Sequence, residues 1–241
     1  MATQLPPVAI LAGGLATRLG PVAEKTPKAL VEVAGKPFIA HQLELLRSHD
    51  LRRVVICVGH LGDTIRDALG DGSGFGVSLQ YSFDGPSLLG TAGALKNALP
   101  LLGNVFYVLY GDAYLECDYR QIHEAFQLSG KPGLIAVYRN EGRWDRSNVV
   151  YSDGVVNLYD KRHQVPEMQY IDYGVGILEA STLSQGSLSL PADLGDIYHE
   201  LSIQERLAGV EVFQRFYEIG SASGLRETQD YLASRRPKSQ G

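Results

Sequence analysis

A glycine-rich turn followed by two cations is the first stretch of the chain that could do chemistry. The apolar run Val8–Leu11 leads into Gly13 and Gly14, and Arg18 and Lys28 come after them. Glycines let backbone N–H groups close around a phosphate, and an arginine with a lysine suits a polyphosphate better than a single carboxylate. The pattern predicts a triphosphate site, while a plain strand-to-helix connection with two solvated cations explains the glycines equally well.

An aspartate directly after a strongly apolar segment is the second candidate. Asp112 follows Gly111 at the end of the hydrophobic run Val105–Tyr110. In open α/β sheets ligands collect beyond the carboxyl ends of the strands, and one carboxylate there can bind Mg²⁺ together with the phosphates of a substrate. The alternative is an aspartate that only completes a tight turn, where Gly-Asp pairs are common.

Several common catalytic motifs are missing from the sequence. Both Gly-Lys pairs, at Gly35 and Gly130, run into proline, which speaks against a P-loop. The first loop lacks the glycine spacing of a dinucleotide-binding fingerprint, since Ala16 stands at its middle position and Leu19 at its last. The six histidines are scattered, and no serine lies in a nucleophile elbow. Hydride transfer, zinc hydrolysis and serine acyl transfer are therefore poorly supported.

Alternating strands and helices must position the candidate residues. In the first half of the chain, apolar runs and segments with helical spacing alternate, at residues 38–49, 54–58, 63–69, 77–83, 91–99 and 105–110. This alternation predicts right-handed βαβ units, and hence an α/β, Rossmann-like three-layer sandwich with a mostly parallel central sheet. The second half has a hairpin turn at 152–154, strands at 170–178 and 210–216, and helices at 193–207 and 225–235.

The composition of the 241 residues describes an ordinary globular protein. The 22 basic and 27 acidic side chains give a net charge of -5, which argues against a nucleic-acid partner. No apolar run approaches the ~20 residues that span a bilayer, so we expect no membrane association. Cys57 and Cys117 lack metal-ligand or redox spacing, which favours inert packing cysteines and a cytoplasmic location. We predict one domain over residues 1–236 and a flexible tail at 237–241.

The ordered motifs resemble those of the sugar-1-phosphate nucleotidyltransferases. Leu11–Lys28, followed by Lys36-Pro37, is similar to that family's signature of a glycine-rich loop, Thr-Arg-Leu, Pro-Lys and Lys-Pro. Gly90–Leu95 resembles the base-recognition segment, and Gly111-Asp112 resembles the motif of the metal aspartate. Asp160-Lys161 resembles the pair that meets the sugar phosphate, and Tyr217–Gly220 resembles the motif that completes the metal site. The resemblance covers nearly the whole chain, and the Gly90–Leu95 segment is similar to that of mannose- and heptose-1-phosphate guanylyltransferases.

This resemblance implies a nucleotide-binding α/β domain with a sugar-binding insertion. The implied reaction transfers a nucleoside monophosphate from an NTP, with GTP favoured, to a mannose- or heptose-type sugar 1-phosphate and releases pyrophosphate. The implied catalytic residues are Arg18, Lys28 and Asp112, and Mg²⁺ is implied at Asp112 and Glu218. The implied nucleotide-binding residues are Leu11, Ala12, Gly13, Gly14, Arg18, Lys28, Gly90 and Thr91. The implied sugar-phosphate residues are Lys161, Asp172 and Gly174, although Asp172 could instead only cap a turn.

Four residues depart from the family pattern, and other functions stay open because the motifs say little about which nucleobase is bound. Ala16 replaces a common glycine, Asp160 a glutamate, Arg162 a proline and Glu218 an aspartate. The alternatives are a uridylyl-, thymidylyl- or cytidylyltransferase with another phosphorylated acceptor, and a non-catalytic nucleotide-sugar sensor. A sensor need not keep the cations Arg18 and Lys28 or the acids Asp112 and Glu218. The presence of all four therefore favours an enzyme. Association of several copies of the chain is left open.

Overall fold

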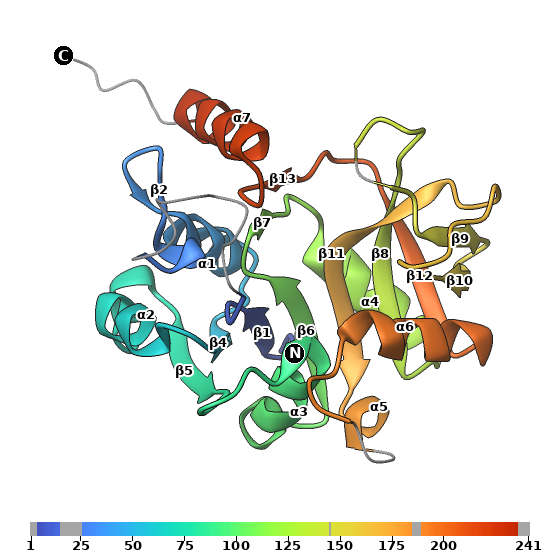
Figure 1. Cartoon of the computed structure of the whole chain (residues 1–241), viewed down its shortest axis with the longest axis horizontal. Coiled ribbons are helices and arrows are strands. Elements are labelled where there is room, and N and C mark those ends of the chain that lie inside the picture. The colour runs from blue at the N-terminus through green and yellow to red at the C-terminus, as the bar shows by residue number, and fades with distance from the viewer. Residues whose placement is uncertain (1–3, 15–25, 145, 185–188, 236–241) are drawn as a thin grey trace.

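A nine-stranded sheet runs through the molecule, with helices on both of its faces (Figure 1). The computed structural model describes residues 4–14, 26–144, 146–184 and 189–235. Across the sheet the strands stand in the order β5 (Ser78–Phe83), β4 (Arg53–Val58), β1 (Val8–Leu11), β6 (Val105–Tyr110), β11 (Tyr170–Glu179), β8 (Gly133–Arg139), β12 (Leu207–Val212), β10 (Val155–Tyr159) and β9 (Val149–Ser152).

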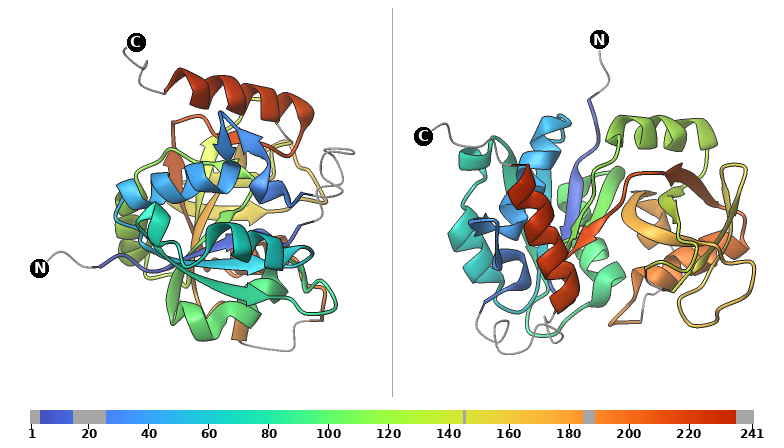
Figure 2. Two further views of the ribbon diagram at one scale, coloured as in Figure 1. Left: turned by 90° about the vertical axis from the view of Figure 1, so that its left-hand side faces the viewer. Right: turned by 90° about the horizontal axis from the view of Figure 1, so that it is seen from above.

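Side chains alternate between two buried faces along the central strands. In β6, Tyr107 and Leu109 join the core on one face, while Phe106 and Val108 join the core on the other. The first face is covered by α1 (Phe38–Ser48), α2 (Gly62–Leu69) and α4 (Tyr119–Ser129), and the second by α3 (Gly90–Leu102), α5 (Ser181–Ser184) and α6 (Leu194–Ile203). Figure 2 (right) shows α4 and α6 on opposite sides of the sheet. Burial on both faces explains why these strands are continuous apolar runs.

The predicted mostly parallel sheet is confirmed only in part, because the sheet is mixed: β12 is parallel to β8, but other strands of the second half are antiparallel to their neighbours. Strands β5, β4, β1 and β6 are parallel neighbours, as the alternating pattern of the first half predicts. Strand β11 is antiparallel to both β6 and β8, and β10 is antiparallel to both β12 and β9. The chain between β8 and β11 carries the β9–β10 hairpin and no crossover helix, which antiparallel strands do not require.

Three elements, α4, α6 and β12, also differ from the prediction. Helix α4 is absent from the predicted elements, although Asp118 caps it by accepting hydrogen bonds from the backbone N–H groups of Arg120 and Gln121, at 3.0 and 3.1 Å. Helix α6 ends at Ile203, so β12 begins at Leu207 rather than at Val210. The hairpin turn between β9 and β10 is confirmed, with Asp153 and Gly154 at positive φ.

Short elements build one end of the molecule beyond the main sheet. The pair β2 (Glu32–Val33) and β3 (Lys36–Pro37) and the pair β7 (Ala113–Tyr114) and β13 (Tyr217–Glu218) each form a small sheet. The last helix, α7 (Ala222–Ser234), packs Leu232 into a cluster with Phe38 and Ile219. In Figures 1 and 2, α7 lies across this end of the molecule, above α1 and β2.

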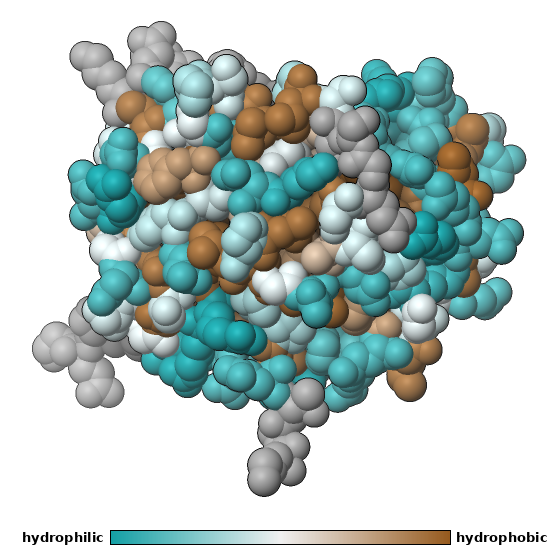
Figure 3. All heavy atoms as spheres, turned by 90° about the horizontal axis from the view of Figure 1, so that it is seen from below, coloured by the Kyte–Doolittle hydropathy of each residue, from teal (hydrophilic) through white to brown (hydrophobic). Residues whose placement is uncertain are grey.

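On the face drawn in Figure 3, hydrophobic residues gather towards the middle and hydrophilic ones cover most of the rim. Within the described ranges, no helix is both long and apolar enough to cross a bilayer. Cys57 and Cys117 are buried and unpaired, and burial raises the pKa of each thiol to about 12, as expected for inert packing residues.

Candidate active site

A cleft of about 950 Å³ opens at the carboxyl ends of β1, β4 and β6, and α7 forms its far wall. This is the edge at which ligands bind in open α/β sheets. Gly111 lies directly against the end of β1, since its backbone N–H donates to the Leu11 carbonyl at 3.0 Å and a Cβ on it would stand 2.7 Å from that oxygen. The close approach of the two strand ends requires glycine there and brings Asp112 next to the Leu11–Gly14 segment.

Three charged side chains from distant parts of the sequence meet in this cleft. Lys28 Nζ donates to Asp112 Oδ2 at 2.6 Å. Glu218 lies beside them because β13 pairs with β7, which places Glu218 opposite Ala113, and the Ile219 N–H donates to the Asp112 carbonyl at 2.9 Å. The structure therefore brings together Lys28, Asp112 and Glu218, as the resemblance implies.

Gly220 marks the point on which these groups converge. A Cβ on Gly220 would stand 2.5 Å from Glu218 Oε2, 3.2 Å from Lys28 Nζ and 3.6 Å from Asp112 Oδ2. Two carboxylates and a nearby phosphate are a donor set that suits Mg²⁺, which needs only one or two protein carboxylates. The residues present therefore fit the ion. Within the described ranges, no group of three or more acidic, histidine or cysteine side chains could hold a metal without the substrate.

The longer side chain of Glu218 is accommodated by the turn that follows it. Its carboxylate folds back to accept hydrogen bonds from the Gly220 N–H and from Ser221 Oγ, the latter at 2.7 Å. Thr228 Oγ1, on α7, donates to the Glu218 carbonyl at 2.8 Å. These contacts fix a glutamate where the family pattern has the shorter aspartate.

The predicted nucleotide segment forms another wall of the cleft. Leu11, Ala12, Gly13, Gly14, Gly90 and Thr91 all line it. Gly90, at φ 77°, packs against the backbone of Ala192, and Ala92 N–H donates to the Ala192 carbonyl at 2.9 Å. The Thr91 hydroxyl accepts a hydrogen bond from the Leu194 N–H at 2.7 Å, so the start of α3 is tied to the start of α6. Arg18 and Ala16 lie outside the described residues.

The predicted sugar-phosphate residues lie beside the cleft rather than in its wall. Lys161 lines a separate pocket of about 190 Å³, with its Nζ 5.5 Å from the ring centroid of Tyr110, which does line the cleft. Asp172 accepts hydrogen bonds from Tyr159 Oη at 3.1 Å and from the Gly174 N–H at 2.9 Å. Burial raises the pKa of the Asp172 carboxyl, and the charge of Lys161 partly offsets this shift. Their part in binding the sugar stays a prediction.

Two parts of the cleft wall are not predicted by any sequence motif. Asp84 lines the cleft and accepts from the Leu89 N–H at 3.1 Å, and burial raises the pKa of its carboxyl. It follows strand β5 directly, as Asp112 follows β6, and that position is the signal that could have revealed it. The second part is an aromatic and cationic wall, for which the sequence carries no spacing signal; it comprises Arg143, Trp144, Arg215, Phe216, Tyr217 and Glu227.

The fold and the site define a class of enzyme that acts on nucleotides and sugar phosphates. A family model described as Nucleotidyl transferase matches residues 8–153, more than half of the chain. The chain therefore belongs to the nucleotidyl transferase family, as a sugar-1-phosphate nucleotidyltransferase.

Individual relatives differ in the base and the sugar that their names state. An N-acetylmuramate alpha-1-phosphate uridylyltransferase from Neisseria meningitidis is 33% identical over 227 residues, which are 91% of this chain and 95% of that protein. A mannose-1-phosphate guanylyltransferase catalytic subunit beta from Drosophila melanogaster is 29% identical, and the match covers 95% of this chain but 63% of that protein. A D-glycero-alpha-D-manno-heptose 1-phosphate guanylyltransferase from Campylobacter jejuni is 26% identical, covering 87% of this chain and 85% of that protein.

The architecture is also that of solved structures. A UDP-glucose pyrophosphorylase from Acinetobacter baumanii superposes with a TM-score of 0.79 over 97% of this chain and 95% of that chain, at 16% sequence identity. At this identity the match concerns the fold alone, and it confirms the α/β architecture with its mixed sheet.

Proposed function

We propose that the chain takes a guanylyl group from GTP and passes it to a mannose- or heptose-type sugar 1-phosphate, with release of pyrophosphate. The observation that carries the proposal is the convergence of Lys28, Asp112 and Glu218 on one point of the cleft. Nucleotidyl transfer depends on neutralising phosphate charge at one place and on holding the two reactants in line.

In this reaction an oxygen of the sugar 1-phosphate attacks the α-phosphorus of GTP. A new O–P bond forms, and the bond from the α-phosphorus to the pyrophosphate oxygen breaks. The attacking oxygen is already anionic near neutral pH, so no general base is needed. Lys28, with its ammonium in the cleft, stabilises charge on the α-phosphate, and Arg18 grips the β- and γ-phosphates.

The two carboxylates and the sugar-side lysine have distinct roles in the proposal. Asp112 and Glu218 would hold Mg²⁺, which when bound supplies positive charge to the phosphates. Lys161 holds the acceptor phosphate from beside the ring of Tyr110, over which its ammonium already lies. Asp172 and Gly174, on β11, bind the sugar of the acceptor, and the Gly174 N–H orients the Asp172 carboxyl.

Asp84 favours guanine over uracil. One of its oxygens accepts from the Leu89 N–H, which leaves the other oxygen available to a ligand in the cleft. An ionised carboxylate only accepts hydrogen bonds. The guanine edge offers two adjacent N–H donors, whereas uracil offers one donor between two carbonyl oxygens that a carboxylate repels.

UTP is the second candidate donor, because the uridylyltransferase from Neisseria meningitidis shares 33% identity with nearly the whole chain. A matrix of pyrophosphate release over four NTPs and several sugar 1-phosphates, with Mg²⁺, separates the two. We expect the strongest signal with GTP and mannose or heptose 1-phosphate. A signal confined to UTP would overturn the choice of base. Silence in every combination, with a thermal shift on nucleotide binding, would instead favour a sensor.

A further inference from the structure

We infer that Trp144 is the platform on which the sugar ring of the acceptor packs, and that Arg215 is the residue that positions it. This inference rests on the proposed function, since it assigns the acceptor end of the same cleft. Trp144 is the single tryptophan of the chain. It lines the cleft with 39% of its surface exposed, although a large aromatic side chain is usually more deeply buried.

Trp144 is held in place by Arg215 and Phe216, which line the cleft together with it. The guanidinium carbon of Arg215 lies 3.9 Å from the centroid of the Trp144 ring and 4.8 Å from that of Tyr217. Phe216 meets the same tryptophan edge-on, with centroids 6.1 Å apart. A planar guanidinium stacks well on aromatic rings, and such contacts hold an exposed side chain in one orientation.

Arg215 is in turn held by an ion pair with α7. Its Nη2 forms an ion pair with Glu227 on α7, and its buried Nε has no hydrogen-bond partner among the described residues. Arg215 stands three positions before Glu218, so their Cα atoms are at most about 11 Å apart. The sugar platform is therefore tied to the segment that carries a carboxylate of the proposed metal site.

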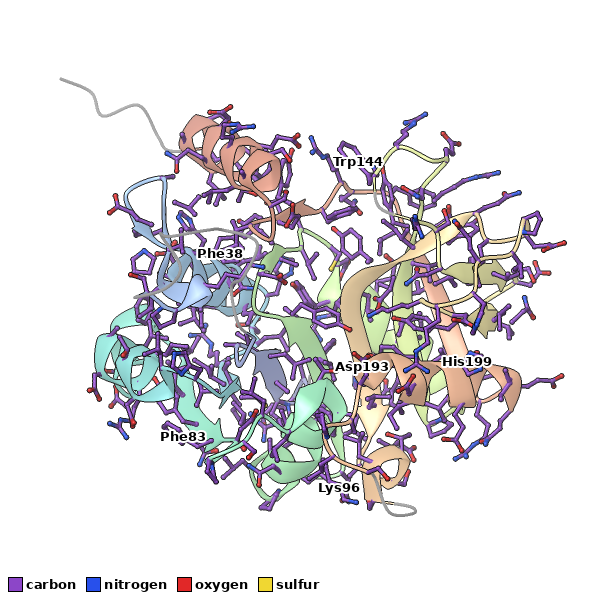
Figure 4. The ribbon with its side chains drawn as sticks, in the orientation of Figure 1. Phe38, Phe83, Lys96, Trp144, Asp193 and His199 are labelled. Carbon is purple, nitrogen blue, oxygen red and sulfur yellow. The ribbon has the colours of Figure 1, made fainter. Side chains whose placement is uncertain are left out.

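The acceptor, rather than the base, is the ligand that suits this wall. Trp144 comes from the loop between β8 and β9, and in Figure 4 it lies on the opposite side of the molecule from Phe83, which precedes Asp84. The predicted base segment, at Gly90, lies on the side of Asp84, where Leu89 bonds to it. A pyranose ring has a face of C–H groups that packs against an aromatic ring, and its hydroxyls point away from that face.

The fluorescence of the single tryptophan tests this assignment directly. Mannose 1-phosphate, glucose 1-phosphate and N-acetylglucosamine 1-phosphate are titrated into the protein with GTP present and Mg²⁺ removed by a chelator, so that no turnover occurs. We expect the sugar phosphate that supports turnover to change the emission saturably, and GTP alone to change it little. Emission that responds to GTP alone, or to none of the three sugar phosphates at millimolar concentration, would overturn the inference.

Kinetics of matched variants give the second readout. Trp144→Ala should raise the acceptor KM at least ten-fold while the GTP KM stays within two-fold, and Trp144→Phe should recover most of the loss. Arg215→Met should shift the emission of Trp144 and raise the acceptor KM by a smaller factor. Phe213→Ala is the control, because Phe213 is 78% exposed on the same segment and lies outside the cleft wall.

The outcomes separate this inference from the proposed function. Equal rises in both KM values for Trp144→Ala would make Trp144 a structural residue and overturn the inference alone. A saturable emission change with a donor other than GTP would keep the inference and overturn the choice of base.

Discussion

Lys28 is the residue whose contacts most constrain the chemistry. Its ammonium donates to Asp112 Oδ2 at 2.6 Å, so its positive charge lies beside a proposed ligand of the metal ion. Lys28→Ala should lower kcat by about 10²–10³, the cost of one preorganised charge contact in a transition state. Steady-state pyrophosphate release measures this, with Lys36→Ala as a control lysine that does not line the cleft. A raised KM for GTP with unchanged kcat would make Lys28 a binding residue only.

Asp84 is the residue on which base choice depends. Asp84→Asn replaces an acceptor-only group with one that also donates, so it should lower kcat/KM for GTP about ten-fold and raise it for UTP. Because burial raises the pKa of the Asp84 carboxyl, the GTP preference should fade as pH drops towards that raised value, before an ordinary aspartate protonates. Competition between GTP and UTP in one mixture measures the ratio. An unchanged ratio in Asp84→Asn would show that other groups read the base.

At the scale of elements, helix α3 links the nucleotide segment to α6. Gly90 begins this helix at φ 77°, and a Cβ there would stand 2.7 Å from the Ala192 backbone N. Gly103 follows its last residue at φ 75° with nothing within 4 Å of an added Cβ. Gly103→Ala should cost about 1–3 kcal/mol of unfolding free energy from backbone strain alone.

Gly90→Ala should cost more than Gly103→Ala and should also raise the GTP KM, because the backbone of Ala192 cannot move aside as a side chain could. Denaturant unfolding and nucleotide kinetics on the same pair of variants check both effects. Equal losses of stability, with an unchanged KM, would contradict the proposed role of this contact.

The elements also show what the sequence could reveal. The strands and helices of the first half could be predicted, because apolar runs alternate there with segments of helical spacing. The position of Asp112 at the end of β6 could be predicted as well, because it also depends only on neighbouring residues. The antiparallel entry of β11 beside β6 depends on a pairing between distant segments, which local patterns do not encode. Helix α4 was missed for a different reason, since its cap at Asp118 is local but its apolar stripe is short.

The same limit applies to the site. Lys28, Asp112 and Glu218 are recognisable because each lies in a motif, although only the fold brings them together. Trp144 and Arg215 meet through loops that are far apart in the sequence, and neither belongs to a motif. Lys161 matches a motif, yet the structure places it in a separate pocket, with its ammonium over the ring of Tyr110.

At the scale of the whole molecule, Asp172 makes the unfolding free energy of the protein depend on pH. It lies on β11, where the parallel strands of the first half meet the strands of the second half. Burial raises the pKa of its carboxyl in the folded state, so folding favours the protonated form. The stability this group contributes is present below its ordinary pKa and is lost as pH rises through the raised value. Asp172→Asn does not titrate, so its unfolding free energy should decline less between about pH 4 and 7 than that of the parent.

Asp160 provides a control of opposite sign for this measurement. The backbone N–H of His163 lowers the pKa of the Asp160 carboxyl, so its contribution is present at neutral pH and is lost on acidification. Asp160→Asn should therefore flatten only the acid side of the stability curve. Parallel curves for Asp172→Asn and the parent protein would contradict the assigned direction of the Asp172 shift.

The most direct test of the central claim compares Asp112→Asn with the parent in Mg²⁺-dependent pyrophosphate release. Asparagine keeps the shape of the side chain but removes its negative charge, so the proposed ion loses one of its two protein carboxylates. We predict a loss of at least a hundred-fold in kcat with unchanged circular dichroism and unfolding midpoint. Turnover close to that of the parent, from a folded Asp112→Asn protein, would contradict the claim that Lys28, Asp112 and Glu218 form the catalytic site.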